Sequence, residues 1–209
     1  LLMPSDHVIA SKSSFNDAIL KASICAENLG MLTTFGIIPH KAETGYGYIK
    51  RGEQLEQAEG CNLVDQFVEK PNKEKAEEYV NSGEYYWNSG IFLFPVKQYL
   101  ETLEKNSPDI HNACKQAMEK TVNDLTFIRP NQEAFLSSPS DSIDYAVMEK
   151  TNKAAMVPVE MGWNDLGAWD AIWDISDKDI NNNVTIGDCL TYNTKNSLIR
   201  SDGPAIATV

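Results

Sequence analysis

The chain has 209 residues, enough to bury one substantial hydrophobic core, and its 42% hydrophobic and 23% charged content is that of an ordinary globular protein. A formal net charge of −12 argues against nucleic acid as a partner, because no surplus of lysine and arginine exists to displace phosphate counterions. No apolar run approaches the roughly 20 residues that a membrane span needs, and no signal peptide is visible, so we expect a cytoplasmic protein without a membrane partner.

An amphipathic helix is the first element that the sequence predicts. Apolar residues recur at helical spacing from Phe15 to Leu29, Ser13 and Ser14 precede them, and Gly30 supplies a stop signal. Residues 31–38 follow as a β-branched and aromatic run typical of a buried strand. A helix followed by such a strand indicates a βαβ unit, and hence an α/β fold with a mixed, mostly parallel sheet.

Strands and helices continue to alternate along the chain. Alternating apolar and polar side chains at residues 61–69 predict a strand that delivers Glu69 and Lys70 at its end, before Pro71. Further strands are expected at residues 48–50, 91–94 and 154–158. Helices are expected at residues 73–81, 96–105, 109–120, 143–149 and 166–175.

The pattern changes near the end of the chain. Short strand candidates occur at regular spacing at residues 184–186, 189–192, 197–200 and 205–209. We therefore expect one α/β domain at residues 1–180, followed at residues 181–209 by the start of a β-rich linker or C-terminal element.

Cysteine and histidine patterns do not support a metal cluster or a hydrolase. The four cysteines are scattered without a CxxC pair, which favours reduced thiols over a disulfide framework. No Gly-x-Ser-x-Gly motif occurs, and no histidine lies in a metal-binding pair.

Asp165 lies between two glycines, shortly after the predicted strand at residues 154–158. A carboxylate at the carboxyl end of a strand lies where open α/β sheets bind their ligands. Asp165 is equally suited to cap the predicted helix at residues 166–175. This segment alone leaves both interpretations open.

Asp6, in the motif Pro4-Ser-Asp-His7, also follows an apparent strand end. In a doubly wound sheet the carboxyl ends of strands converge on one crevice, where two carboxylates could share a magnesium ion with substrate phosphates. The alternative is that Asp6 is a turn residue and His7 an ordinary surface histidine.

Three further motifs carry groups that can bind sugars or phosphates. Glu69 offers a carboxylate, which suits sugar hydroxyls, and Lys70 an ammonium group, which suits phosphate. Asn88 lies beside a serine and a glycine and offers an amide for hydroxyl groups. The glycines of Thr44-Gly-Tyr-Gly-Tyr48 let main-chain groups approach a ligand, although the loop lacks P-loop spacing. Ordinary turn chemistry explains the Asn88 motif equally well.

Together and in this order, these motifs resemble those of bacterial mannose-1-phosphate guanylyltransferases, a branch of the sugar-phosphate nucleotidyltransferase family. Ser142-Ile-Asp-Tyr145 and Trp163-Asn-Asp-Leu-Gly167 favour the mannose branch, and the resemblance runs to about residue 175. The β-rich tail resembles the segment that joins this domain to a C-terminal phosphomannose isomerase domain in two-domain members.

The resemblance implies a Rossmann-like α/β nucleotidyltransferase domain that transfers GMP from GTP to mannose 1-phosphate, giving GDP-mannose and pyrophosphate. GTP and mannose 1-phosphate would be its partners and Mg²⁺ its cofactor, and a homo-oligomer is left open. The implied site residues are Asp6 and Asp165 as catalytic magnesium ligands, Glu69 and Asn88 at the sugar hydroxyls, Lys70 near the sugar phosphate, and Gly45, Tyr46 and Gly47 as the turn against the sugar.

One part of the family pattern is missing from the chain. The family's N-terminal glycine-rich signature, with its arginine and lysine for the triphosphate, does not occur, so we expect an N-terminally truncated form that does not turn over alone. Two alternatives remain: a nucleotidyltransferase for another hexose 1-phosphate, and a non-catalytic sugar-phosphate-binding module that kept the sugar pocket.

Overall fold

The computed structural model describes residues 1–209, which form two compact units that we describe separately. Unit 1 comprises Leu1–Pro4 and Ser11–Met161, and unit 2 comprises Ser5–Ala10 and Gly162–Val209. None of the helices combines the length and the apolar character that crossing a membrane requires.

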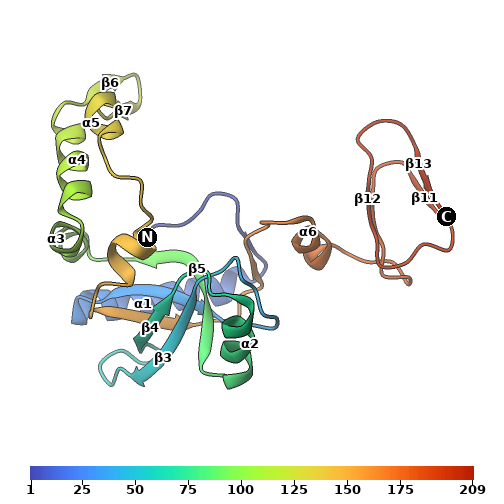
Figure 1. The fold of residues 1–209 in the computed structure, drawn as a ribbon, viewed down its shortest axis with the longest axis horizontal. Coiled ribbons are helices and arrows are strands. Elements are labelled where there is room, and N and C mark those ends of the chain that lie inside the picture. The colour runs from blue at the N-terminus through green and yellow to red at the C-terminus, as the bar shows by residue number, and fades with distance from the viewer. The chain divides into compact units, whose positions relative to one another are not determined.

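A mixed five-stranded sheet forms the centre of unit 1 (Figure 1). Its strands, in the order in which they pair, are β2 (Leu32–Ile37), β5 (Tyr85–Leu93), β3 (Tyr48–Gln54), β4 (Asn62–Val68) and β8 (Ala154–Pro158). The sheet closes on itself, because β8 pairs with β2 as well as with β4.

The mixed α/β architecture predicted from the sequence is confirmed, but parallel pairs do not predominate in the sheet. Only β2 and β8 pair in parallel, whereas the other four pairings are antiparallel. For β3 and β4 the physical reason is their connection, residues 55–61, which is too short for the crossover that parallel neighbours need. This antiparallel hairpin places β3 between β4 and β5, the two strands that α2 connects.

Two predicted helices cover this sheet and end at the residues that the sequence indicated. Helix α1 (Lys12–Leu29) packs against β2 and β8; Ser11 caps its start, and Gly30, at φ +63°, ends it. Helix α2 (Lys73–Ser82) packs against β5, and the Asn72 side chain accepts a hydrogen bond of 3.0 Å from the Lys75 N–H.

The predicted helices near residues 96–120 are confirmed as α3 (Val96–Asn106) and α4 (Pro108–Glu119). A small hairpin and a short helix follow, with bounds β6 (Val122–Asp124), β7 (Phe127–Arg129) and α5 (Gln132–Leu136). The helix expected at residues 143–149 is a single π-helical turn, η1 (Asp144–Met148).

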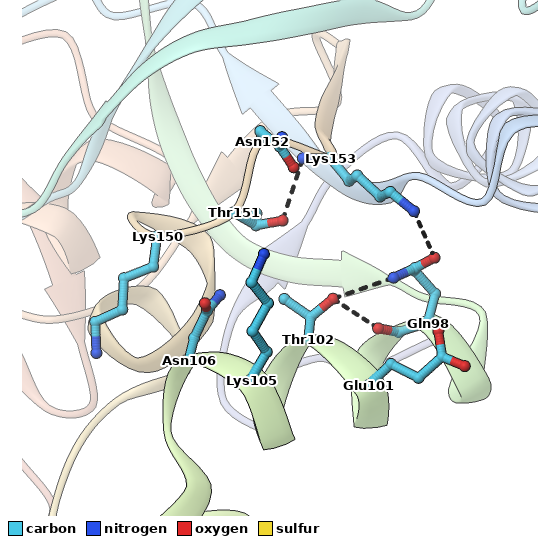
Figure 2. A pocket seen from close by; sticks show the side chains of 9 residues that line it. All are labelled: Gln98, Glu101, Thr102, Lys105, Asn106, Lys150, Thr151, Asn152 and Lys153. Atoms are coloured by element: carbon cyan, nitrogen blue, oxygen red, sulfur yellow. Dashed lines mark hydrogen bonds between the residues drawn. The ribbon is translucent and has the colours of Figure 1, made fainter.

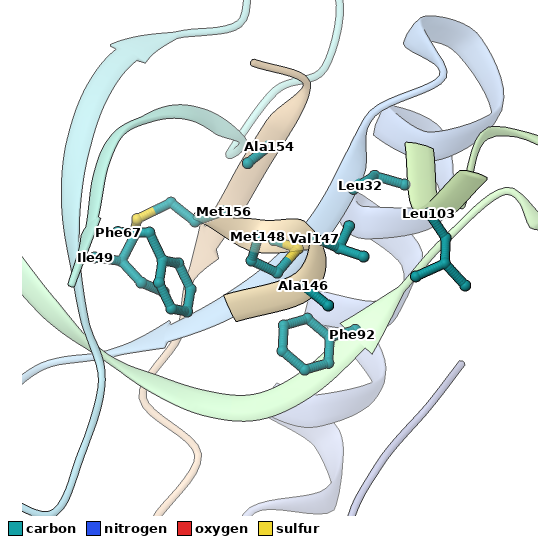
Figure 3. Close-up of a cluster of buried hydrophobic side chains, with 10 residues drawn as sticks. All are labelled: Leu32, Ile49, Phe67, Phe92, Leu103, Ala146, Val147, Met148, Ala154 and Met156. Atoms are coloured by element: carbon teal, nitrogen blue, oxygen red, sulfur yellow. The ribbon is translucent and has the colours of Figure 1, made fainter. Parts of the chain in front are cut away.

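Turn η1 is fixed by the hydrophobic core (Figure 3). Its residues Val147 and Met148 are at most 1% exposed and belong to a cluster with side chains from all five strands of the sheet and from α3. Fully burying such side chains contributes about 1.5–3 kcal/mol each. The polar residue at the start of η1, Asp144, is thereby held in place by the core beneath it.

Unit 2 contains one antiparallel and two parallel strand pairs. Strand β1 (Val8–Ile9) pairs with β9 (Trp163–Asn164) in the antiparallel sense. The strands expected near the chain end are confirmed and pair in parallel, β10 (Val184–Ile186) with β12 (Leu198–Arg200) and β11 (Cys189–Thr191) with β13 (Ile206–Thr208). Helix α6 (Trp169–Ile175) begins later than residue 166, because Leu166 adopts a left-handed conformation, with φ +55°.

Candidate functional site

Glu69 and Lys70 lie at the end of β4, where the chain turns. Lys70 has φ +48°, a left-handed conformation that lysine rarely adopts, and its N–H donates to the Tyr46 carbonyl oxygen at 3.2 Å. This turn brings both side chains together, with Lys70 Nζ 3.2 Å from Glu69 Oε1. The predicted strand end thus presents a paired carboxylate and ammonium group.

Gly47 allows the loop at residues 45–47 to pass directly beneath Glu69. A Cβ atom at Gly47 would overlap Glu69 Oε2 and lie 3.3 Å from Asn88 Cβ, whereas a Cβ atom at Gly45 would meet nothing within 4 Å. The Gly47 carbonyl oxygen also accepts a 2.8 Å hydrogen bond from the Asn88 N–H. Of the two glycines, Gly47 is therefore the one that the close approach requires.

Asn88 lies within β5, and not in a turn before a strand, as its Asn-Ser-Gly sequence had suggested. The Thr34 hydroxyl donates to Asn88 Oδ1 at 2.9 Å, and Asn88 Nδ2 donates to Asp144 Oδ1 at 3.0 Å. A register shift between Thr34 and Gly36 in the β2–β5 pairing lies next to this contact. Both ends of the amide are fixed by the protein, so its orientation is set.

Asp144 lies in contact with Asn88, and sequence reasoning did not single it out as a candidate ligand group. The motif Ser142-Ile-Asp-Tyr145 was noted, but nothing in its spacing shows that Asp144 reaches Asn88, which lies 56 positions away. The available signal was the motif itself, because Ser142 is typical of the start of a helical turn. Its hydroxyl oxygen accepts a 3.4 Å hydrogen bond from the Tyr145 N–H. We refer to Glu69, Lys70, Asn88 and Asp144 as the polar cluster.

Burial dominates the electrostatics of the polar cluster. Desolvation raises the pKa of Glu69, whose side chain is only 10% exposed, and the neighbouring Lys70 offsets part of this effect. Burial likewise raises the pKa of Asp144, and the hydrogen bond from Asn88 opposes it. The hydrogen bond to Glu69 raises the pKa of Lys70. A partly buried set of oxygen acceptors with one cation suits a ligand that carries both hydroxyl groups and an anion.

Aromatic rings adjoin the loop at residues 45–47. Tyr46 and Trp87 meet edge to face with ring centroids 5.2 Å apart, and His40 meets Trp87 at 4.8 Å. Trp87 is 2% exposed, so it fixes Tyr46 from beneath and is not itself a ligand surface.

Asp6 and Asp165 both belong to unit 2, where β1 and β9 bring them together. Val8 pairs with Asn164, so the antiparallel register places Asp6 and Asp165 just beyond the same end of the strand pair. The contact between Trp163 Nε1 and His7 Nδ1, at 3.1 Å, joins the two strands there. The expectation that both aspartates follow core strands was wrong: Asp6 precedes β1, and Asp165 follows the two-residue strand β9.

The structure also decides against Asp165 as a helix cap. The N-cap of α6 is Ala168, and Asp165 Oδ1 instead accepts a 3.1 Å hydrogen bond from the Gly167 N–H. A structural metal cage is absent as well, because no three His, Cys, Asp or Glu side chains are grouped to hold an ion. An exposed and a half-buried carboxylate fit a magnesium ion that takes its remaining ligands from water and phosphate.

Comparison with known proteins finds a match to the family described as nucleotidyl transferase over residues 1–182. The chain is 50% identical over 214 residues to mannose-1-phosphate guanylyltransferase 2 of Escherichia coli O157:H7. It is 43% identical over 209 residues to the alginate biosynthesis protein AlgA of Pseudomonas aeruginosa. Both alignments cover all of this chain but only 44% and 43% of these relatives, so the chain spans less than half of their length.

Solved structures show the same mixed α/β fold. A Thermus thermophilus structure described as mannose-1-phosphate geranyltransferase has a TM-score of 0.85 and 28% identity, covering 99% of this chain and 58% of that one. A Helicobacter pylori structure described as mannose-6-phosphate isomerase has a TM-score of 0.69 and 35% identity, covering 78% of this chain and 62% of that one.

Proposed function

Residues 1–182 match the nucleotidyl transferase family, so the chain belongs to this family, and we propose that the full-length protein transfers GMP from GTP to mannose 1-phosphate. The observation that carries the proposal is the 50% identity, along the whole chain, to a relative named mannose-1-phosphate guanylyltransferase 2. In this reaction a phosphate oxygen of the sugar bonds to the α-phosphorus of GTP. The bond from that phosphorus to the bridging oxygen breaks, and the electron pair leaves with pyrophosphate.

The polar cluster supports a role in holding the sugar phosphate. Glu69 and Asp144 offer carboxylate oxygens that accept hydrogen bonds from hydroxyl groups, and Lys70 offers an ammonium group to the phosphate. Asn88 reaches Asp144 through an amide that Thr34 holds in one orientation. Such fixed groups accelerate a transfer between two bound substrates by positioning the attacking oxygen, and they require no covalent intermediate.

Members of this family typically use a divalent metal, and we propose that Asp6 and Asp165 hold Mg²⁺. Two carboxylates at one end of a strand pair match the donor set that magnesium takes alongside phosphates. When bound, the ion would offset negative charge on the phosphate groups.

A substrate panel on the full-length protein tests the proposed function. Pyrophosphate release is measured with GTP, UTP, dTTP and ATP, each paired with mannose 1-phosphate and with glucose 1-phosphate, with Mg²⁺ present. We expect the highest kcat/KM for GTP with mannose 1-phosphate. A higher value for another pair would assign the protein to another hexose phosphate, and no release with any pair would favour a non-catalytic sugar-phosphate-binding module.

A further inference from the structure

A polar pocket lies in unit 1, between α3 and the segment that joins η1 to β8 (Figure 2). It has a volume of about 230 Å³, and none of its lining residues belongs to the polar cluster or to the aspartate pair. We call it the α3 pocket. Its lining residues are Gln98, Glu101, Thr102, Lys105, Asn106, Lys150, Thr151, Asn152 and Lys153.

The α3 pocket concentrates positive charge on a strongly acidic chain. Three of its nine lining residues are lysines, although the chain has only 18 lysines and arginines and a net charge of −12. None of the three lysines forms an ion pair. The only carboxylate in the lining, that of Glu101, lies 3.9 Å from Nζ of Lys97, and Lys97 does not line the pocket. The lining therefore carries three cations against a single carboxylate, and that carboxylate pairs with a lysine outside the pocket.

Hydrogen bonds hold part of the lining in place before any ligand arrives. Gln98 Oε1 accepts a 3.1 Å hydrogen bond from Lys153 Nζ, and Gln98 Nε2 donates to Thr102 Oγ1 at 3.3 Å. Thr102 is only 7% exposed, and its hydroxyl donates to the Gln98 backbone carbonyl oxygen at 2.7 Å. Figure 2 shows Lys105 extending toward Thr151, whereas Lys150 points away, toward Ser107, which it meets at 3.5 Å. Lys105 and Lys153 are thus the cations that face the pocket.

Hydrogen-bond donors accompany these cations. The amides of Asn106 and Asn152 make no hydrogen bond within the chain, and both line the pocket. Ammonium and amide donors that outnumber the single carboxylate of the lining form a setting for phosphate oxygens. The volume is below the roughly 300–1,000 Å³ of pockets for drug-sized ligands, so a small anion fits and a whole nucleotide does not.

We propose that the α3 pocket is a second anion site, which binds a small phosphorylated ligand with two or more negative charges. Inorganic pyrophosphate and a small phosphate ester share this chemistry. The alternative is structural: Lys105 lies in the last turn of α3, where a cation stabilises the carbonyl end of a helix, and Lys153 only orients Gln98.

Titration calorimetry on the full-length protein in EDTA tests the site, with inorganic pyrophosphate, inorganic phosphate and glycerol 3-phosphate as probes. Pyrophosphate should bind, and its affinity should fall as the salt concentration is raised, because the lysines are exposed. The double variant K105Q/K153Q should weaken pyrophosphate roughly tenfold or more. K115Q/K120Q removes two exposed lysines outside the pocket and should leave the affinity for pyrophosphate unchanged. Tighter binding of glycerol 3-phosphate than of pyrophosphate would assign the site to a phosphate ester.

Two further variants keep the test decisive. K105R/K153R retains the charge and should retain binding, even if the glutamine variant unfolds at a lower temperature. Lys70→Ala, in the polar cluster, should not change pyrophosphate binding in EDTA. The proposal is overturned if K105Q/K153Q binds pyrophosphate as the unmodified protein does, if none of the probes binds, or if Lys70→Ala alone abolishes binding.

Discussion

Asn88 Nδ2 donates a 3.0 Å hydrogen bond to Asp144 Oδ1, and this contact joins strand β5 to the π-helical turn η1. Both partners are at least partly buried, and Thr34 holds the other end of the amide at 2.9 Å. A carboxylate taken partly out of water needs such donors, since leaving it unsatisfied costs about 1–3 kcal/mol or more. The contact therefore serves the fold and the proposed sugar site at once.

Asn88→Asp replaces the donor by a second carboxylate facing Asp144. We expect the free energy of unfolding at neutral pH to fall by about 1–3 kcal/mol, because two like charges then meet in a partly buried setting. The loss should shrink at acidic pH, where one carboxyl of the pair holds a proton. Urea denaturation at several pH values measures both effects.

Asn112→Asp is the matched control for this substitution, since Asn112 is exposed on α4 and makes no hydrogen bond through its side chain. It adds the same charge, and we expect it to change stability by less than about 0.5 kcal/mol. Equal losses for the two variants would show that net charge, and not the contact with Asp144, is responsible.

Gly47→Ala tests the close approach of the loop to Glu69. The new methyl group would meet the Glu69 carboxylate and Asn88 Cβ, so one of these side chains must move. We expect a loss of stability of about 1–3 kcal/mol and a clear rise in KM for mannose 1-phosphate in the full-length protein. Gly45→Ala is the control, because its methyl group meets nothing within 4 Å. Similar KM values for the two variants would remove Gly47 from the proposed site.

The local parts of this structure follow from the sequence. Asn72 and Gly83 mark the ends of α2, and the break before Pro71 correctly places Glu69 and Lys70 at a strand end. These features depend on neighbours in the chain, through capping and backbone preference. The proposed roles of the residues remain predictions, but their local positions could be read directly.

Long-range relationships could not be read in this way. Thr34 and Asp144 meet Asn88 across 54 and 56 positions, and no periodicity encodes either contact. The antiparallel sheet was missed for a similar reason, because the βαβ pattern around α1 says nothing about the hairpin that follows it. Asp165 resembled a helix cap only because the left-handed conformation of Leu166 was not foreseen.

Glu69→Gln separates stability from the proposed binding role. Burial raises the folded-state pKa of Glu69 above its ordinary value of 4.5, so at intermediate pH the folded chain holds more protons at this site than the unfolded chain. The free energy of unfolding must then fall as pH rises from the unfolded pKa through the folded pKa. Glutamine does not ionise, so this fall in the free energy of unfolding is absent from Glu69→Gln. The stability of the variant relative to the unmodified protein should therefore increase with pH above about 4.5.

The same variant should bind mannose 1-phosphate about 10- to 100-fold more weakly, since hydrogen bonds to a charged acceptor contribute about 1.5–3 kcal/mol. Urea denaturation between pH 4 and pH 8 and calorimetry with the sugar phosphate provide the two measurements. Glu133→Gln, at an exposed position on α5, is the control. A relative stability that decreases with pH would contradict the burial argument, and unchanged sugar binding would contradict the role of Glu69.

Asp165→Asn tests the proposed magnesium pair in the full-length protein. Because Asp165 does not cap α6, replacing its carboxylate by the asparagine amide should leave the unfolding midpoint nearly unchanged. We expect the rate with GTP and mannose 1-phosphate at saturating Mg²⁺ to fall by about 10²-fold or more. Binding of Mn²⁺, followed by electron paramagnetic resonance without substrates, should weaken in parallel. Asp177→Asn, at an exposed position of the same unit, should change neither quantity. If Asp165→Asn keeps its rate, its magnesium dependence and its Mn²⁺ affinity, the ion must be held by residues other than the pair that β1 and β9 bring together.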